Sequence, residues 1–230
     1  MNLTTQDMIG IGLYSVREAS RLTSVPPRVI RRWLHGYAYS YRAAERLSPP
    51  VWQSQLASGA EGTIGFLDLM ELRFVNAFRR SGVSLQVIRA AAERACDLFQ
   101  MDHPFSRRRF ATDGRRIFTD ALIHAGETEL MDVLTNQYAF RQIISPSLHS
   151  SVQFKHEEVV RWFPMWPKRK VVIDPSICFG RPIIKDGAVP TEVLYRSYEA
   201  EKSVKFVATI YDVPPSAVRA AIDYERKLAA

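Results

Sequence analysis

Apolar residues recur at helical spacing near the start of the chain, in two runs separated by a short turn. The apolar positions of the two runs are Val16, Ala19 and Leu22, and then Ile30, Trp33 and Leu34. Spacings of three and four residues place each set on one face of a helix. Ser15 and Glu18 match a capping box, and Pro26-Pro27 suits the start of the second helix. Residues 15–36 are therefore predicted to fold as helix, turn, helix.

The rest of the chain mixes helical and extended patterns. Tyr37, Tyr39 and Tyr41 alternate with small residues, which is typical of a strand and of an enlarged wing. Further helices are predicted over residues 66–80, from Ser84 onward, and over 127–144, 191–198, 203–211 and 215–228; Thr191 is expected to cap its helix. Short strands are predicted over 152–154, 159–163, 171–173 and 182–184. The predicted fold class is α+β, mainly α.

Residues 103–118 show the pattern of a β-hairpin. Asp113-Gly114 lies between two short apolar runs, and such a pair between two runs is a hairpin signal. The predicted strands carry a second basic patch, made of Arg107, Arg108, Arg109, Arg115 and Arg116. This patch could follow a phosphate backbone, pair with an acidic protein, or protect an exposed strand edge from aggregation.

Composition and charge narrow the class of protein. The 230 residues are 47% hydrophobic, which excludes disorder of the whole chain, and their net charge is +7, which favours an anionic partner such as nucleic acid. Residues 1–150 contain 18 arginines and no lysine. A guanidinium group binds phosphate and guanine in a bidentate manner, although a GC-rich coding bias explains this preference equally well. Without a membrane-spanning run, a signal peptide or a disulfide framework, we expect a cytoplasmic protein.

The second predicted helix carries the best candidates for DNA contact. Arg28, Arg31 and Arg32 lie on a different face from its apolar residues. A helix that enters the major groove contacts bases with its first residues and phosphates with flanking ones. Arg28 is therefore expected to reach a base edge, and Arg31 and Arg32 to contact phosphates, with Arg17 and Arg42 as weaker companions. The alternative is a solvated basic helix face.

The last two predicted helices repeat the pattern of the first pair at a shift of 188 residues. Val25 corresponds to Val213, and Pro26-Pro27 to Pro214-Pro215. The basic face does not recur, since Ser216 and Ala220 stand where the first pair has Arg28 and Arg32. We expect the first pair to bind DNA and the last pair to pack or to contact protein.

Catalytic and metal-binding patterns are not recognisable in the sequence. The five histidines and two cysteines lack ligand spacing, and neither a Walker loop nor a glycine-rich dinucleotide motif occurs. We therefore expect a protein that is not an enzyme and that uses no cofactor or metal.

Two parts of the chain resemble known families. Residues 13–34, with Tyr14-Ser15-Val16-Arg17-Glu18-Ala19, and residues 66–89 resemble the MerR-type winged helix-turn-helix. Ser24 replaces the usual glycine before the turn valine, and the family's arginine-and-tyrosine wing motif is not recognisable between residues 38 and 62. The C-terminal part resembles the domain of unknown function number 433, through Val172-Ile173-Asp174-Pro175, Gly180-Arg181-Pro182-Ile183-Ile184 and Val189-Pro190-Thr191.

The combined resemblance implies an antitoxin. A MerR-like front joined to this C-terminal domain is similar to VapB-type antitoxins, which pair with PIN-like ribonuclease toxins. Together with the hairpin pattern, it predicts three regions: a DNA-binding domain over residues 1–100, a basic hairpin and connector over 101–166, and an antitoxin-type domain over 167–230. It also implies a homodimer on operator DNA, with Arg181 as a candidate to block the toxin's site. The alternative is a stand-alone MerR-like regulator whose C-terminal domain serves only oligomerisation.

Overall fold

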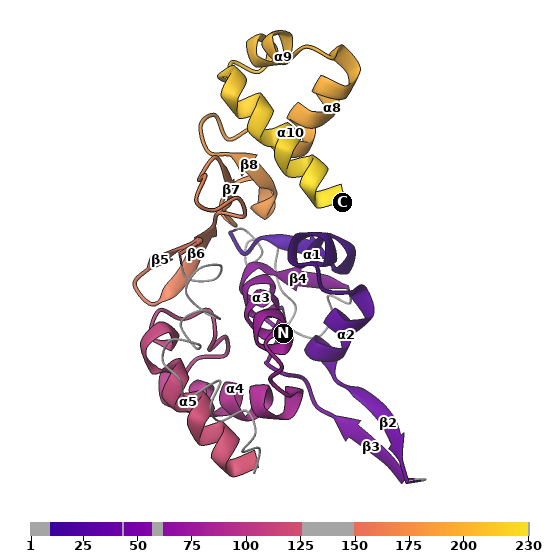
Figure 1. Ribbon diagram of the computed structural model, residues 1–230, viewed down its shortest axis with the longest axis vertical. Helices are drawn as coiled ribbons and strands as arrows, with labels where there is room; N and C mark the ends of the chain where they lie inside the picture. Colours follow the sequence, from indigo (N-terminus) through magenta and orange to yellow (C-terminus); the bar gives the residue numbers. More distant parts are fainter. Residues whose placement is uncertain (1–9, 43, 57–61, 126–149, 230) are drawn as a thin grey trace. The chain divides into compact units, whose positions relative to one another are not determined.

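The computed structural model describes residues 10–42, 44–56, 62–125 and 150–229, which group into two compact units (Figure 1). The first unit takes residues 14–125 and 155–159, and the second takes residues 10–13, 150–154 and 160–229. Both contain helices and small sheets, so the predicted α+β class is confirmed. The predicted helix over 127–144 lies outside the described residues.

The first unit builds a helical body with one long hairpin. In chain order its elements are β1 (Leu13–Ser15), α1 (Val16–Thr23), α2 (Pro27–His35), β2 (Tyr37–Tyr41), β3 (Ala44–Ser48), β4 (Thr63–Gly65), α3 (Phe66–Arg80), α4 (Leu85–Phe99) and α5 (Phe110–Ala125). Strand β1 pairs with β4, and β2 pairs with β3 as an antiparallel hairpin that extends from the end of α2 (Figure 1).

An aromatic cluster fills the core of this unit. Its members come from α3, from the segment before α5, and from α5 itself, and all have 0% exposure: Phe74, Phe78, Phe105, Phe110 and Phe118. The ring centres of Phe78 and Phe118 are 4.4 Å apart, and those of Phe105 and Phe110 are 5.0 Å apart. This packing holds α5 against α3.

The prediction of a β-hairpin over residues 103–118 is wrong, because Asp113 and Gly114 lie inside helix α5. Among the described positions of that helix, the buried hydrophobic residues are Phe110, Ile117, Phe118, Ala121 and Leu122. Steps of seven, eight, eleven and twelve residues place them on one helical face. The free energy gained by burying this apolar face outweighs the local turn preference of two residues. The predicted basic strands therefore do not form.

In its described residues, the second unit combines a four-stranded sheet with three α-helices. The sheet order is β5 (Val152–Lys155), β6 (Glu158–Trp162), β7 (Val171–Ile173) and β8 (Pro182–Ile184), with a 3₁₀ turn, η2 (Cys178–Gly180), between the last two. The helices are α8 (Thr191–Glu201), α9 (Val204–Ile210) and α10 (Pro215–Ala229).

Thr191 does not cap α8 as predicted, because Pro190 occupies the N-cap position and Thr191 is the first helical residue. The Thr191 hydroxyl instead lies 2.5 Å from the Glu225 carboxylate of α10 and 3.3 Å from the Pro182 carbonyl oxygen. A buried hydroxyl needs such partners, so this side chain ties the sheet to two helices.

Candidate nucleic-acid interface

Helix α1 begins with the capping box that the sequence predicts. The Glu18 N–H donates to Ser15 Oγ at 3.2 Å, and the Ser15 N–H donates to the Glu18 carboxylate at 2.8 Å. Two backbone donors at the helix start are thereby satisfied. This fixes the end of α1 from which Arg17 projects into solvent.

The turn between α1 and α2 is held from both sides. Val25 is buried within the turn, with 1% exposure, and Asn76 of α3 donates to the Thr23 carbonyl oxygen at 3.2 Å. Ser24 has φ of +57°, the left-handed conformation that glycine usually supplies. Serine therefore adopts the left-handed conformation that this turn requires.

Helix α2 separates a buried face from a basic one. Ile30, Trp33 and Leu34 are buried, whereas Arg28 and Arg31 are exposed. Arg32 is half-buried, with its guanidinium carbon 4.6 Å from the centre of the Tyr37 ring. The helix thus presents Arg28 and Arg31 to solvent and rests Arg32 on the hairpin that follows.

The β2–β3 hairpin, called the wing below, places tyrosine and arginine on one face. Its register pairs Tyr37 with Ser48 and Tyr39 with Arg46, and residues paired directly in an antiparallel ladder share a face. Tyr39 is 42% exposed, Arg46 is exposed, and the Tyr37 and Tyr39 ring centres are 5.9 Å apart. The tyrosine and arginine side chains of this face therefore come from two different strands.

The base of the wing is fixed to the helical body. A Cβ atom added at Gly36, where φ is +72°, would lie 2.5 Å from the Ser48 carbonyl oxygen, so glycine is required where the wing crosses the end of α2. Arg89 of α4 donates to the Pro49 carbonyl oxygen at 3.1 Å and to Ser48 Oγ at 2.7 Å. Arg42, at the other end of the wing, is exposed, with φ of +50°. Sequence reasoning missed Arg89, because its partners lie about forty residues earlier.

A buried carboxylate organises the segment that returns from the wing. Asp68 of α3 accepts hydrogen bonds from Trp52 Nε1 at 2.9 Å, from Ser54 Oγ at 2.9 Å and from the Gln55 N–H at 3.0 Å, and His103 Nε2 lies 3.1 Å away. Burial alone raises the pKa of Asp68, but these hydrogen bonds and the proximity of His103 outweigh it and hold the pKa below its ordinary value.

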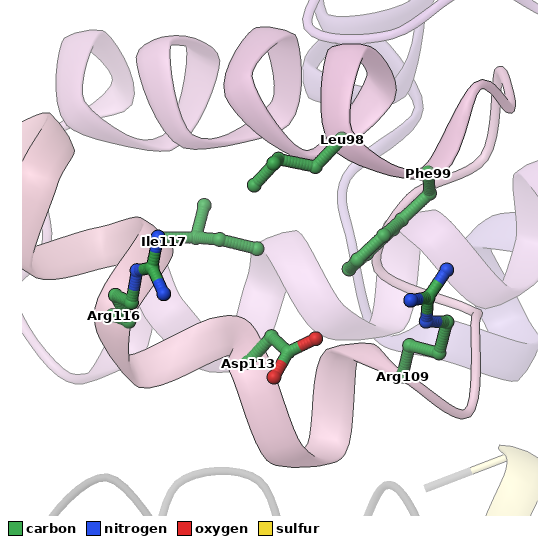
Figure 2. A pocket seen from close by; sticks show the side chains of 6 residues that line it. All are labelled: Leu98, Phe99, Arg109, Asp113, Arg116 and Ile117. Atoms are coloured by element: carbon green, nitrogen blue, oxygen red, sulfur yellow. The ribbon is translucent and has the colours of Figure 1, made fainter.

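The five arginines of the predicted basic hairpin are not all exposed. Arg107 is buried and forms an ion pair with Glu158 at 3.1 Å, so its role is structural. Arg108, Arg109, Arg115 and Arg116 are exposed around the start of α5. Figure 2 shows Arg109 and Arg116 on opposite sides of a pocket between α4 and α5, with Asp113 between them. The carboxylate reduces the positive charge of this pocket.

Arg181 lies at the turn between β7 and β8 and is exposed. It does not pair with Asp174, whose carboxylate lies 2.5 Å from Arg161 Nε and accepts from the Ser176 N–H at 2.9 Å. Cys178, Phe179 and Gly180 all have positive φ, and Phe179 is 66% exposed. The turn therefore exposes an aromatic and a cationic residue that are two positions apart in the sequence.

The described residues contain no group of three or more His, Cys, Asp or Glu side chains placed to hold a metal ion. Cys96 is half-buried and Cys178 is exposed, and both are free thiols. No helix in the described ranges combines the length and the apolar character that crossing a membrane requires.

Comparisons with known proteins support two domains. A family model described as "Putative DNA-binding HTH domain" matches residues 12–92, and one described as "Protein of unknown function (DUF433)" matches residues 171–224. The Mycobacterium tuberculosis protein "Putative antitoxin VapB45" is 25% identical over 225 residues, 93% of each chain. The crystal structure of Rv2018 from Mycobacterium tuberculosis has a TM-score of 0.73 at 23% identity, covering 94% of this chain and 99% of that one. The chain therefore joins an N-terminal helix-turn-helix domain to a C-terminal DUF433 domain.

Proposed function

We propose that this protein is a cytoplasmic, DNA-binding antitoxin that acts by binding and not by catalysis. The observation that carries the DNA-binding half is the placement of Arg28 and Arg31 on the exposed face of α2, beside the tyrosine-and-arginine face of the wing. The first residues of such a helix contact base edges in the major groove, while flanking cations contact phosphates. Arg28 is assigned to a base, and Arg31, Arg32, Arg17 and Arg42 to the DNA backbone.

A symmetric dimer would bind a palindromic operator in its own promoter and repress its own operon. Its two α2 helices would then lie about 34 Å apart, or a multiple of that distance, along the DNA. The MerR-type character of the winged domain belongs to this proposal.

The antitoxin half of the proposal rests on the similarity to "Putative antitoxin VapB45" and on the turn between β7 and β8. Left-handed residues other than glycine cost about 1–3 kcal/mol each and cluster at functional sites. At Cys178 and Phe179 this conformation displays an exposed aromatic residue two positions before Arg181. Aromatic and arginine side chains dominate the energy of protein interfaces. Arg181 would pair with carboxylates of a PIN-like ribonuclease toxin, with Phe179 packed beside it.

Binding to the protein's own promoter, measured across a salt series, tests the DNA-binding half. Replacing Arg28 by Ala should cost about 1–3 kcal/mol of specific binding free energy. Replacing Arg31 by Ala should lower the slope of log K against log salt by about one, which corresponds to one lost phosphate contact. Arg219 is the matched control, because it is exposed on α10 at the position that corresponds to Arg31. If the Arg28 and Arg31 variants bind like the parent and like the Arg219 control, α2 does not contact DNA.

Co-expression with the product of the neighbouring gene tests the antitoxin half. We expect a stable complex in a pull-down and rescue of growth, both weakened by Arg181→Ala and by Phe179→Ala. Arg80→Ala, which removes an exposed charge from the last turn of α3, serves as the control for loss of an exposed charge. A protein that binds its promoter but neither captures the neighbouring product nor rescues growth is a stand-alone regulator.

A further inference from the structure

The positive charge of the C-terminal part is concentrated in one short segment. Residues 164–188 contain five basic and two acidic residues, whereas residues 151–163 and 189–230 each contain equal numbers of both. One of the two acidic residues, Asp174, is 3% exposed and already paired with Arg161. The excess of positive charge therefore lies on the surface around β7 and β8. The helices that follow have no net charge.

Backbone hydrogen bonds bring three lysines of this segment together. The Lys185 N–H donates to the Lys170 carbonyl oxygen at 2.9 Å, beside the register pair Val171 and Ile184. The Lys170 N–H in turn donates to the Lys168 carbonyl oxygen at 2.8 Å. All three side chains are exposed, and within the described residues none forms an ion pair. Their charges are available to an outside partner.

An aromatic side chain accompanies the lysines. The Arg169 guanidinium carbon lies 4.6 Å from the centre of the Trp166 ring and 5.0 Å from that of Phe163. Phe163 belongs to a buried hydrophobic cluster, so its contact with Arg169 fixes the position of the guanidinium group above that cluster. Trp166 is 39% exposed, whereas the other three tryptophans are at most 6% exposed. An exposed ring and a guanidinium group among further cations present a positively charged surface to an anionic partner.

We propose that this basic edge, made of Trp166, Lys168, Arg169, Lys170 and Lys185, binds the phosphate backbone of duplex DNA as a contact separate from α2 and the wing. Lysine ammonium groups bind phosphates as point charges and need no particular base sequence. The edge therefore adds affinity for any duplex, and it does not depend on the base contact assigned to Arg28. An acidic protein surface is the competing partner, and the test includes it.

Salt-dependent binding of the full-length chain to a duplex of arbitrary sequence tests the proposal. The variant Lys170→Gln/Lys185→Gln should lower the slope of log K against log salt by about two, since each lost phosphate contact removes about 0.9. The control Lys205→Gln/Lys227→Gln removes two exposed lysines from α9 and α10 and should leave the slope unchanged. Equal slopes in both variants, whether reduced or unchanged, would overturn the proposal.

Fluorescence quenching of Trp166 provides a readout that a change in net charge alone does not alter. Acrylamide should quench mainly Trp166 in the free protein, and saturating DNA should shield it; Trp166→Phe should remove the quenchable component. This shielding should persist in Arg28→Ala/Arg31→Ala, so a failure of the α2 assignment remains distinguishable from a failure of the basic edge. Continued quenching of Trp166 on DNA contradicts the proposal. Loss of toxin capture by Lys170→Gln/Lys185→Gln with an unchanged DNA slope assigns the edge to an acidic protein instead.

Discussion

The guanidinium carbon of Arg32 lies 4.6 Å from the centre of the Tyr37 ring, so the last turn of α2 rests on the first residue of the wing. The Tyr37 ring lies 5.9 Å from that of Tyr39, which pairs across the wing with Arg46. This chain of contacts places the helix and the wing on one surface. Arg32 therefore has a structural role in addition to the phosphate contact that we propose for it.

Tyr37→Ala should weaken operator binding by about two- to five-fold, because an exposed cation–π contact contributes about 0.5–1 kcal/mol. The loss would arise from a less ordered Arg32 and not from a lost base contact. Fluorescence anisotropy with labelled operator DNA measures it. Tyr37→Phe keeps the ring and should bind like the parent. If Tyr37→Ala also binds like the parent, the contact does not position Arg32.

Ser24→Gly should raise the free energy of unfolding by about 1 kcal/mol, because a left-handed residue other than glycine carries a steric cost of that size. Urea unfolding measures the change, and DNA affinity should stay the same because the turn keeps its path. Ser81→Gly is the matched control: Ser81 ends α3 with φ of −87° and donates to the Ala77 carbonyl oxygen at 3.0 Å. Glycine there should destabilise the fold, and a gain at both positions would contradict the argument.

Phe118→Ala should cost about 3–5 kcal/mol, because it empties the centre of the aromatic cluster around α5. On the same helix, Ile123 is 58% exposed, so Ile123→Ala should change stability by no more than about 0.5 kcal/mol. Chemical denaturation of both variants compares a buried with an exposed position of the helix. Similar losses at the two positions are incompatible with a helix that buries the Phe118 face.

Signals that span a few neighbouring residues predicted much of the fold. The Ser15 and Glu18 pattern formed its capping box, and the alternation that begins at Tyr37 formed a strand. The Asp113-Gly114 signal failed because it is two residues long, whereas the apolar period from Phe110 to Leu122 extends over three helical turns. A longer periodic pattern outweighs a local turn preference, since it decides which surface is buried.

The contacts that support the candidate site were beyond sequence reasoning. Asp68 bonds to Gln55 and lies beside His103, and Arg89 bonds to Ser48, at separations from 13 to 41 residues. No periodic pattern encodes such pairs, because they depend on how the helices pack. The wing face is a similar case, since Arg46 meets Tyr39 only through the register of the hairpin. The arginines predicted to contact DNA stay a prediction that binding data must test.

Two buried carboxylates on α3 give opposite dependences of stability on pH. The pKa of Asp68 is lowered, so the stability it contributes is lost only as pH falls through that lowered value. Burial raises the pKa of Glu71 from 4.5 to about 7, despite the hydrogen bonds it accepts from the Ser106 N–H at 2.8 Å and the Phe105 N–H at 3.3 Å. The two effects occupy separate pH ranges, and because the nearby charge of His103 also acts on Glu71, a Glu71 variant is needed to isolate its contribution.

Between pH 4.5 and about 7, Glu71 is protonated in the folded protein and ionised in the unfolded chain. The folded state then binds more protons, so stability should fall as pH rises through this range, by at most about 3 kcal/mol. Denaturation midpoints measured from pH 4.5 to 8 should show this decline, and Glu71→Gln should remove its contribution. The absolute stability of the variant is a poor readout, because an amide offers the Ser106 and Phe105 N–H groups one acceptor oxygen instead of two. The informative quantity is the slope of stability against pH. If this slope is the same in Glu71→Gln as in the parent, Glu71 does not titrate in this range.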